Sequence, residues 1–206
     1  MSHLTYSHHH TFFENKELNE FYMAIAIMTF GEALISIFVP IYLYELSYSI
    51  LEIILFYFMV SAAFVICSIP GAKIVGRIGV KHAILLSTPF LIAYFLALRW
   101  LPDFQWLYFA APVLLALRMV CYNFGYHLNF ILHSDRKKRG QQISAIGILT
   151  VLSHIVAPLI GGTIAQLSFA ALYVTGSVFL VAGTIPLFFH KDSERVHFRM
   201  DVDKRF

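Results

Sequence analysis

Two residues of opposite charge lie deep inside long apolar stretches of the sequence. Glu32 falls within an apolar run at about 21–43, and Arg118 falls within another at about 105–130. A lone charge at the bilayer centre costs about 3 kcal/mol or more, so such residues generally face a cavity or a partner. Glu32 could bind and release a proton or pair with a cation. Arg118 could hold an anionic group or tune the pKa of Glu32.

Polar side chains accompany both charges at helical spacing. Thr29 precedes Glu32 by three residues and Ser36 follows it by four, while Tyr122 follows Arg118 by four. Residues at this spacing share one face of a helix. We therefore expect a central cavity for a substrate or a proton, lined by Glu32, Arg118, Thr29, Ser36, Tyr122 and Asn129. The alternative is a static ion pair that only stabilises helix packing.

The composition indicates which elements position these residues. Of 206 residues, 59% are hydrophobic and 13% are charged, whereas about 25% are charged in a soluble domain. This excludes ordinary soluble enzymes, nucleic-acid-binding domains and disordered tails. A membrane-spanning helix needs about 20 mostly apolar residues. The sequence predicts an all-α integral membrane protein with six transmembrane helices, at about 21–43, 51–69, 83–101, 105–130, 142–165 and 169–189.

Lys and Arg residues predict the orientation of these helices. They gather between the second and third helices, between the fourth and fifth (residues 136–139), and after the sixth. Cytoplasmic loops carry such an excess. We expect a cell (inner or plasma) membrane protein with a cytoplasmic segment at 1–20, a six-helix bundle at 21–189 and a cytoplasmic tail at 190–206. The net charge of +3 reflects this bias, so the expected partner is the lipid bilayer and not a nucleic acid.

The helix starts suggest an internal repeat. Starts near 21 and 105, 51 and 142, and 83 and 169 differ by 84, 91 and 86 residues. Blocks of three helices must be inverted relative to one another, which is typical of transporters. Glu32 and Arg118 are 86 residues apart and lie roughly 17 and 18 Å from the inner ends of their helices, at about 1.5 Å per residue. The alternative is that six helices of even size give similar offsets by accident.

Other reactive residues fit weaker hypotheses. His154 could transfer protons or simply form a hydrogen bond across a packed interface. The histidine run at 8–10 could bind metal, but a polar lead-in explains it better, and Cys67 and Cys121 are interpreted as apolar filler. No Gly-rich phosphate loop followed by Lys-Ser/Thr is present. We expect no cofactor, no metal site and no enzyme activity.

Three motifs together resemble the N-terminal six-helix half of the major facilitator superfamily, over about residues 18–195. In the segment 72–81, Arg77, Gly79 and Lys81 match the family's gating loop between helices 2 and 3. Gly76 replaces the aspartate that helps to hold the inner gate closed in the family. The resemblance therefore implies a gating loop at this place, but it leaves that charged latch in doubt.

The other two motifs lie in the fourth and fifth helices. Arg118 matches the arginine of the family's Arg-x-x-Gln-Gly pattern, which is linked to proton transfer in antiporters, although Cys121 and Tyr122 replace the last two residues. The fifth helix ends the family's glycine pattern with Ala157, Pro158, Gly161 and Gly162. Small residues allow helices to pack closely. In the family this motif is associated with antiporters.

The resemblance implies transport of a small solute by alternating access, with proton-coupled export as one form. It also implies a second six-helix half, because the family holds substrate between two halves. That half could be a second copy in a homodimer or a separate chain, or the sequence could be a fragment. The alternative function is a multi-pass membrane scaffold, or a truncated family fragment, that does not transport.

Overall fold

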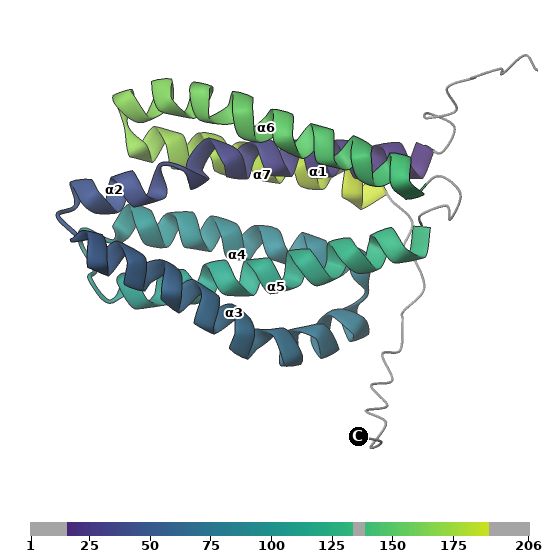
Figure 1. The fold of residues 1–206 in the computed structure, drawn as a ribbon, viewed down its shortest axis with the longest axis horizontal. Helices are drawn as coiled ribbons and strands as arrows, with labels where there is room; N and C mark the ends of the chain where they lie inside the picture. The colour runs from purple at the N-terminus through teal and green to yellow at the C-terminus, as the bar shows by residue number, and fades with distance from the viewer. Residues whose placement is uncertain (1–15, 134–138, 190–206) are drawn as a thin grey trace, which may run out of the picture.

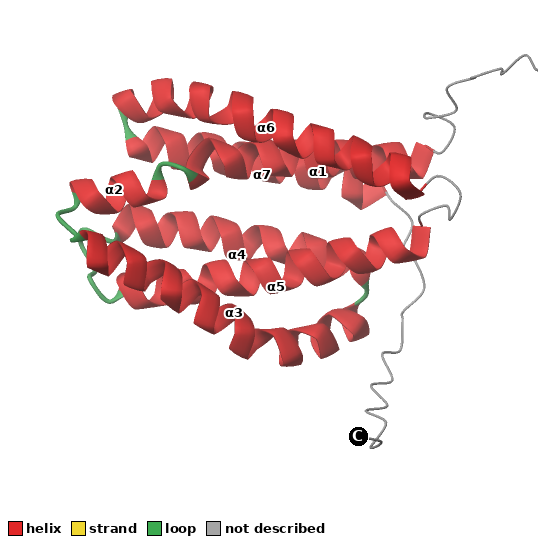
Figure 2. Ribbon diagram, in the orientation of Figure 1, coloured by secondary structure: helices red, strands yellow, loops and turns green. Residues whose placement is uncertain are grey.

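The computed structural model describes residues 16–133 and 139–189, and every regular element in them is an α-helix (Figure 2). The other residues, which include the histidine run at 8–10, lie outside the described residues. The seven helices, joined by short connections, are α1 (Lys16–Ser36), α2 (Val39–Glu45), α3 (Ile50–Ile78), α4 (Val80–Trp100), α5 (Leu107–His133), α6 (Arg139–Leu167) and α7 (Phe169–Phe189).

Six stretches are long and apolar enough to cross a membrane, which confirms the predicted all-α fold and makes this a multi-pass membrane protein. The first stretch, Tyr22–Glu45, consists of α1 and α2 together. The expected single helix is interrupted at residues 37–38, just before Pro40 in the first turn of α2. Proline has no backbone N–H and is favoured in a first turn, so the chain restarts a helix there.

Two connections have clear local causes. Ser49 begins α3 with a capping box, in which its hydroxyl accepts from the Glu52 amide at 3.3 Å and Glu52 accepts from the Ser49 amide at 2.7 Å. At its other end α3 continues to Ile78, beyond the expected 69, so Lys73 and Arg77 lie on the helix. The expected loop before the next helix is reduced to Gly79, whose φ of 88° suits glycine.

The helices form two groups of three (Figure 1). We call α1, α6 and α7 the α1 bundle, and α3, α4 and α5 the α5 bundle, because α1 packs mainly against α7 and α6, while α5 packs mainly against α4 and α3. The first helix of each predicted repeat thus packs against the second and third helices of the other. This exchange gives the two blocks of three helices equivalent contacts, which agrees with the predicted repeat.

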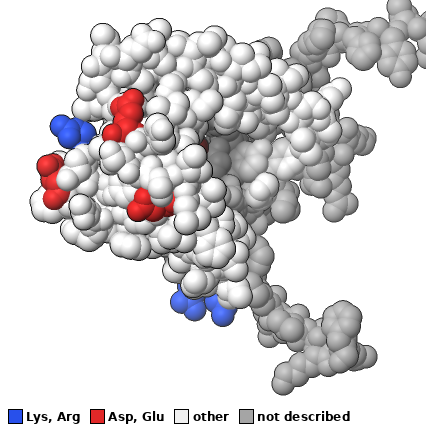
Figure 3. Space-filling view, turned by 60° about the vertical axis from the view of Figure 1, so that its left-hand side comes forward, with Lys and Arg blue, Asp and Glu red and all other residues white. Residues whose placement is uncertain are grey.

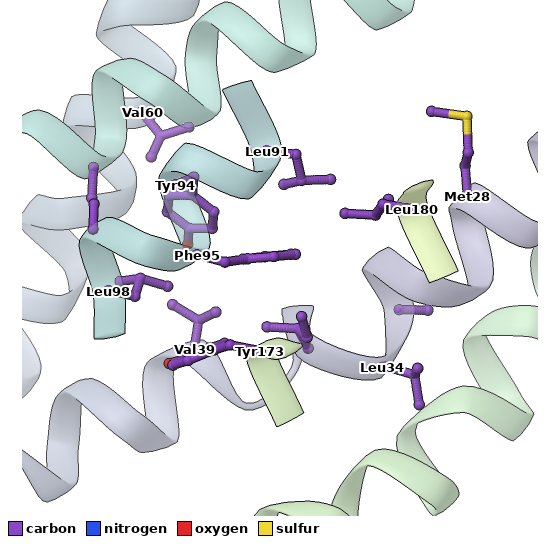
Figure 4. Packing of buried hydrophobic residues seen from close by; sticks show 14 of the residues in the cluster. Met28, Leu34, Val39, Val60, Leu91, Tyr94, Phe95, Leu98, Tyr173 and Leu180 are labelled. Atoms are coloured by element: carbon purple, nitrogen blue, oxygen red, sulfur yellow. The ribbon is translucent and has the colours of Figure 1, made fainter. Parts of the chain in front are cut away.

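Aromatic and aliphatic side chains of α4 and α7 join the two bundles. Phe95 and Leu91 of α4 meet Tyr173 and Leu180 of α7, and all four are buried (Figure 4). The Phe95 and Tyr173 rings are nearly parallel, with centroids 6.1 Å apart. Burial of each such side chain stabilises the fold by about 2 kcal/mol in water; in lipid, close packing replaces that driving force.

The two ends of the bundle differ in charge. The start of α1, the α3–α4 connection, the facing ends of α5 and α6 and the end of α7 all lie at one end, here called the basic end (Figure 1). Arg77 and Lys81 flank the α3–α4 connection there. The α2–α3, α4–α5 and α6–α7 connections lie at the opposite end. Charged side chains cover little of the face between them (Figure 3), as expected for a surface in contact with lipid.

Candidate functional site

An ion pair joins the two bundles in the middle of the spanning helices. Arg118 of α5 donates a hydrogen bond from its Nη2 atom to Oε2 of Glu32 on α1. The side chain of Arg118 is only 8% exposed, whereas that of Glu32 is 29% exposed. The two residues that the sequence placed at the same depth are therefore direct partners, and the acid is the more accessible of them.

Tyr122 connects the ion pair to further polar groups. Its ring lies 4.5 Å from the Arg118 guanidinium carbon, a cation–π geometry. Its phenol is hydrogen-bonded to the side chain of Thr29 on α1, and its ring stacks on Tyr126 with centroids 6.0 Å apart. Four of the six predicted cavity residues thus form one connected group: Glu32, Arg118, Thr29 and Tyr122.

The remaining predicted residues are less closely placed. Ser36 lies one turn beyond Glu32 and is exposed at the end of α1. Asn129 lies on α5, but its side chain is outside the described part of the structure. Sequence reasoning missed the buried aromatic residues of α4, Tyr94 and Phe95, which pack where the two bundles meet. Spacing on one helix gives no signal for them, because their contacts depend on packing between helices.

The helix-packing motif of α6 meets α1 near the ion pair. A Cβ atom at Gly161 would clash with the carbonyl oxygen of Leu34, and one at Gly162 would lie 3.4 Å from the Phe38 ring. Ala157 of the same motif is fully buried, and Pro158 lies within the helix. Glycine therefore lets α6 approach the α1 backbone two residues beyond Glu32, and this contact holds the acid-bearing turn in place.

A matching contact occurs in the other bundle. A Cβ atom at Gly71 of α3 would overlap Cγ1 of Val120 on α5, two residues beyond Arg118. The two glycines are 161 − 71 = 90 residues apart, and their targets, Leu34 and Val120, are 120 − 34 = 86 apart. These offsets agree with those of the predicted repeat. Both charges are thus carried by helices that a glycine brings close to a neighbour.

The predicted gating residues lie together at the basic end. Arg77 is exposed in the last turn of α3, Lys81 is in the first turn of α4, and Gly79 forms the turn between them. Gly76, which takes the place of the family's aspartate, is buried. The basic residues and the tight turn are therefore present, but position 76 itself supplies no carboxylate to a latch.

The remaining candidates lie apart from the ion pair or show no ligand pattern. His154 is exposed on α6, and its Nδ1 atom lies 2.8 Å from the carbonyl oxygen of Thr150 one turn earlier. Cys67 and Cys121 are free thiols. Within the described residues, no cluster of three His, Cys, Asp or Glu side chains could hold a metal ion.

The ion pair holds two charged groups that could each bind another charge. In the structure the two charges neutralise each other and Tyr122 covers the guanidinium. A cation on Glu32 or an anion on Arg118 would compete with the pair, since each supplies one partner with a different counter-charge. Burial of Arg118 makes an unpaired state costly. The arrangement places a carboxylate and a guanidinium at the contact between α1 and α5.

Comparison with known proteins agrees with this geometry. No curated protein matches the chain significantly. Residues 21–201 match the Major Facilitator Superfamily, and this match includes all six spanning stretches. The six-helix arrangement, the inverted pairing of its three-helix blocks and the family match lead to one conclusion: the chain belongs to the major facilitator superfamily and corresponds to a six-helix half of that fold.

Proposed function

We propose that the chain moves a small solute across the membrane by proton-coupled alternating access. Members of its family are transporters rather than enzymes. The observation that carries the proposal is the Glu32–Arg118 pair, in which the acid keeps 29% of its side chain exposed in the middle of a spanning helix. This exposure leaves the carboxylate accessible to a proton or to a group of the substrate.

The proposed cycle uses the pair as a switch. A cationic or polar group of the substrate binds the ionised Glu32 in competition with Arg118. A proton on Glu32 then expels that group, so the acid holds the substrate and the proton in turn and the two move in opposite directions. The contacts of Tyr122 with Arg118 and of its phenol with Thr29 support this role, because they span both helices and would change together. Export against protons is the direction suggested by the antiporter-type α6 motif.

A second six-helix half completes the proposed transporter. Side chains of α3 and α6 are mostly exposed, and Gly140 and Gly147 of α6 would each leave a Cβ atom with open space around it. His154 lies farther along that helix and is also exposed. Small residues allow close helix approach, and a mid-membrane histidine is better accommodated by protein than by lipid. We propose this α6 surface as the contact with the second half, either another copy or a separate chain.

The proposed orientation places the basic end in the cytoplasm of a cell membrane. Lys and Arg residues follow the positive-inside rule at that end. Arg77, Gly79 and Lys81 would then lie at the inner gate, where the single-residue turn makes α3 and α4 move together. A cysteine at Gly140, near the basic end of α6, should react with a membrane-impermeant maleimide only after the inner side is opened.

A flux assay in vesicles tests the transport proposal. Purified protein is reconstituted with the pH dye pyranine inside, and the organic cation ethidium and the organic anion carboxyfluorescein serve as probes. We expect movement of one probe to be accompanied by proton movement in the opposite direction. Glu32→Gln should abolish the proton signal, and Arg118→Lys should reduce flux at least about tenfold, since lysine lacks the planar guanidinium.

Glu45→Gln is the matched control. Glu45 is exposed at the end of α2 and lies away from the ion pair, so this variant should transport like the unmodified protein. Normal flux in both Glu32→Gln and Arg118→Lys would contradict the proposed mechanism. No flux of either probe in any oligomeric form, including a complex with a separate six-helix chain, would favour the non-transporting scaffold.

A further inference from the structure

A long groove runs between α4 and α7, apart from the ion pair. Its volume is about 630 Å³, within the range of small-molecule sites. The rings of Phe95 and Tyr173 are buried at its floor, and Val174, Val178 and Ile185 form exposed rims. Figure 4 shows the same two rings side by side between the ribbons of α4 and α7. The groove therefore follows the seam where the two bundles meet.

The groove is apolar along nearly its whole length. Its α7 side extends from Ala170 to Ile185, which is about 22 Å at roughly 1.5 Å per residue. This exceeds half of the ~30 Å hydrocarbon core, so the groove can hold an extended acyl chain of one leaflet. Ser177 donates its hydroxyl proton to the carbonyl oxygen of Tyr173 at 2.8 Å, so it is already satisfied within its own helix.

One positive charge lies at the mouth of this groove. Arg99 lines it in the last turn of α4, at the end opposite the basic end. The aromatic side chains of Trp100, Phe104 and Trp106 are exposed around this level, as is typical of the membrane–water interface. An apolar channel with a guanidinium at interfacial depth matches a phosphate headgroup with a long hydrocarbon tail.

We propose that this groove binds a glycerophospholipid, with one acyl chain between α4 and α7 and the phosphate on Arg99. Asp103 follows Arg99 by four residues and is exposed. It offers a partner to an ammonium group beyond the phosphate, so phosphatidylethanolamine is the headgroup that fits both charges. A lipid in this position covers the seam between the bundles and stabilises their contact.

Native mass spectrometry of the purified protein tests the proposal. The probes are phosphatidylethanolamine and diacylglycerol with identical acyl chains, so that they differ only in the headgroup. We expect one retained phosphatidylethanolamine per six-helix unit, with an affinity at least about tenfold above that of diacylglycerol, because a charge-assisted hydrogen bond is lost without phosphate. Arg99→Gln should remove this preference, and Arg99→Lys should keep part of it.

A variant whose side chain fills the groove tests the binding of the acyl chain separately from that of the headgroup. Ala182→Phe should lower retention of both lipids at least about tenfold, while Val113→Phe, on an exposed apolar position of α5, should leave both unchanged. Size-exclusion profiles and helical content confirm that each variant is folded. Equal retention of the two lipids, or no effect of either Arg99→Gln or Ala182→Phe, would overturn the proposal. Efficient disulfide crosslinking of Val178→Cys between two copies would overturn it as well, because a protein neighbour would then occupy the groove.

Discussion

The α1 bundle and the α5 bundle share a backbone plan and differ in the side chains at its centre. In each, the first helix of a repeat packs on the second and third helices of the other repeat, and a glycine meets it two residues beyond the charge. The charges themselves are opposite: Glu32 on α1 and Arg118 on α5. The position equivalent to Tyr122 is Ser36, since 122 − 86 = 36. The packing scheme is thus repeated, whereas the candidate chemistry depends on the difference.

The largest expected effect comes from removing one charge at a time. Glu32→Leu leaves Arg118 buried and unable to lose its charge, so we expect unfolding to become easier by about 3–5 kcal/mol. Arg118→Leu leaves the more exposed Glu32, which can take up a proton, and should cost only about 1–3 kcal/mol. Unfolding in mixed detergent micelles measures both. Equal losses would show that the two bundles bury their charges equally.

Substitution of either glycine should lower stability, and only one of the two losses should be restored by a second substitution. Gly161→Ala places a methyl group against the backbone oxygen of Leu34, so we expect a loss of about 3 kcal/mol that no change of the Leu34 side chain restores. Gly71→Ala meets only the side chain of Val120 and should cost about 1–2 kcal/mol. Adding Val120→Ala should recover most of that. Rescue of Gly161→Ala by Leu34→Ala would contradict the difference between the bundles.

Exchanging the charges tests whether the asymmetry matters. We expect the double variant Glu32→Arg with Arg118→Glu to be more stable than either single variant by about 2 kcal/mol, because the ion pair is restored across the same interface. Its proton-coupled flux should stay absent, since the acid would move to α5 and the guanidinium would leave the Tyr122 ring. Full flux in the exchanged protein would show that the acid can function on α5 as well as on α1.

The smallest expected effect concerns the equivalent positions 122 and 36. Tyr122→Phe keeps the ring over Arg118 but loses the hydrogen bond to Thr29, so we expect a loss of about 1 kcal/mol in stability. Ser36→Ala, at the exposed end of α1, should change stability by less than about 0.5 kcal/mol. The same unfolding assay compares the two variants. A larger loss of stability for Ser36→Ala would show that the polar contacts depend on α1 more than on α5.

Much of the architecture was predictable because lipid imposes simple rules on a sequence. The number of spans was correct, the predicted equal level of the two charges agrees with their direct pairing, and the agreement of their offsets indicated the repeat. The expected loop before α4 was too long, because apolar residues after Pro70 continue the helix to Ile78 with two basic residues on its surface. The break at residues 37–38 was missed for a related reason: both sides of it are equally apolar.

The sequence by itself determined which stretches are long and apolar enough to span a membrane, and it predicted that two charges lie level with each other. Only the tertiary structure decided that Arg118 turns toward Glu32 and that Tyr122 reaches Thr29. The physical reason is that hydropathy is read along a helix axis, whereas partners depend on how helices rotate and approach. That rotation is set by contacts such as those of Gly71 with Val120 and of Gly161 with Leu34, which join residues 120 − 71 = 49 and 161 − 34 = 127 positions apart in the chain.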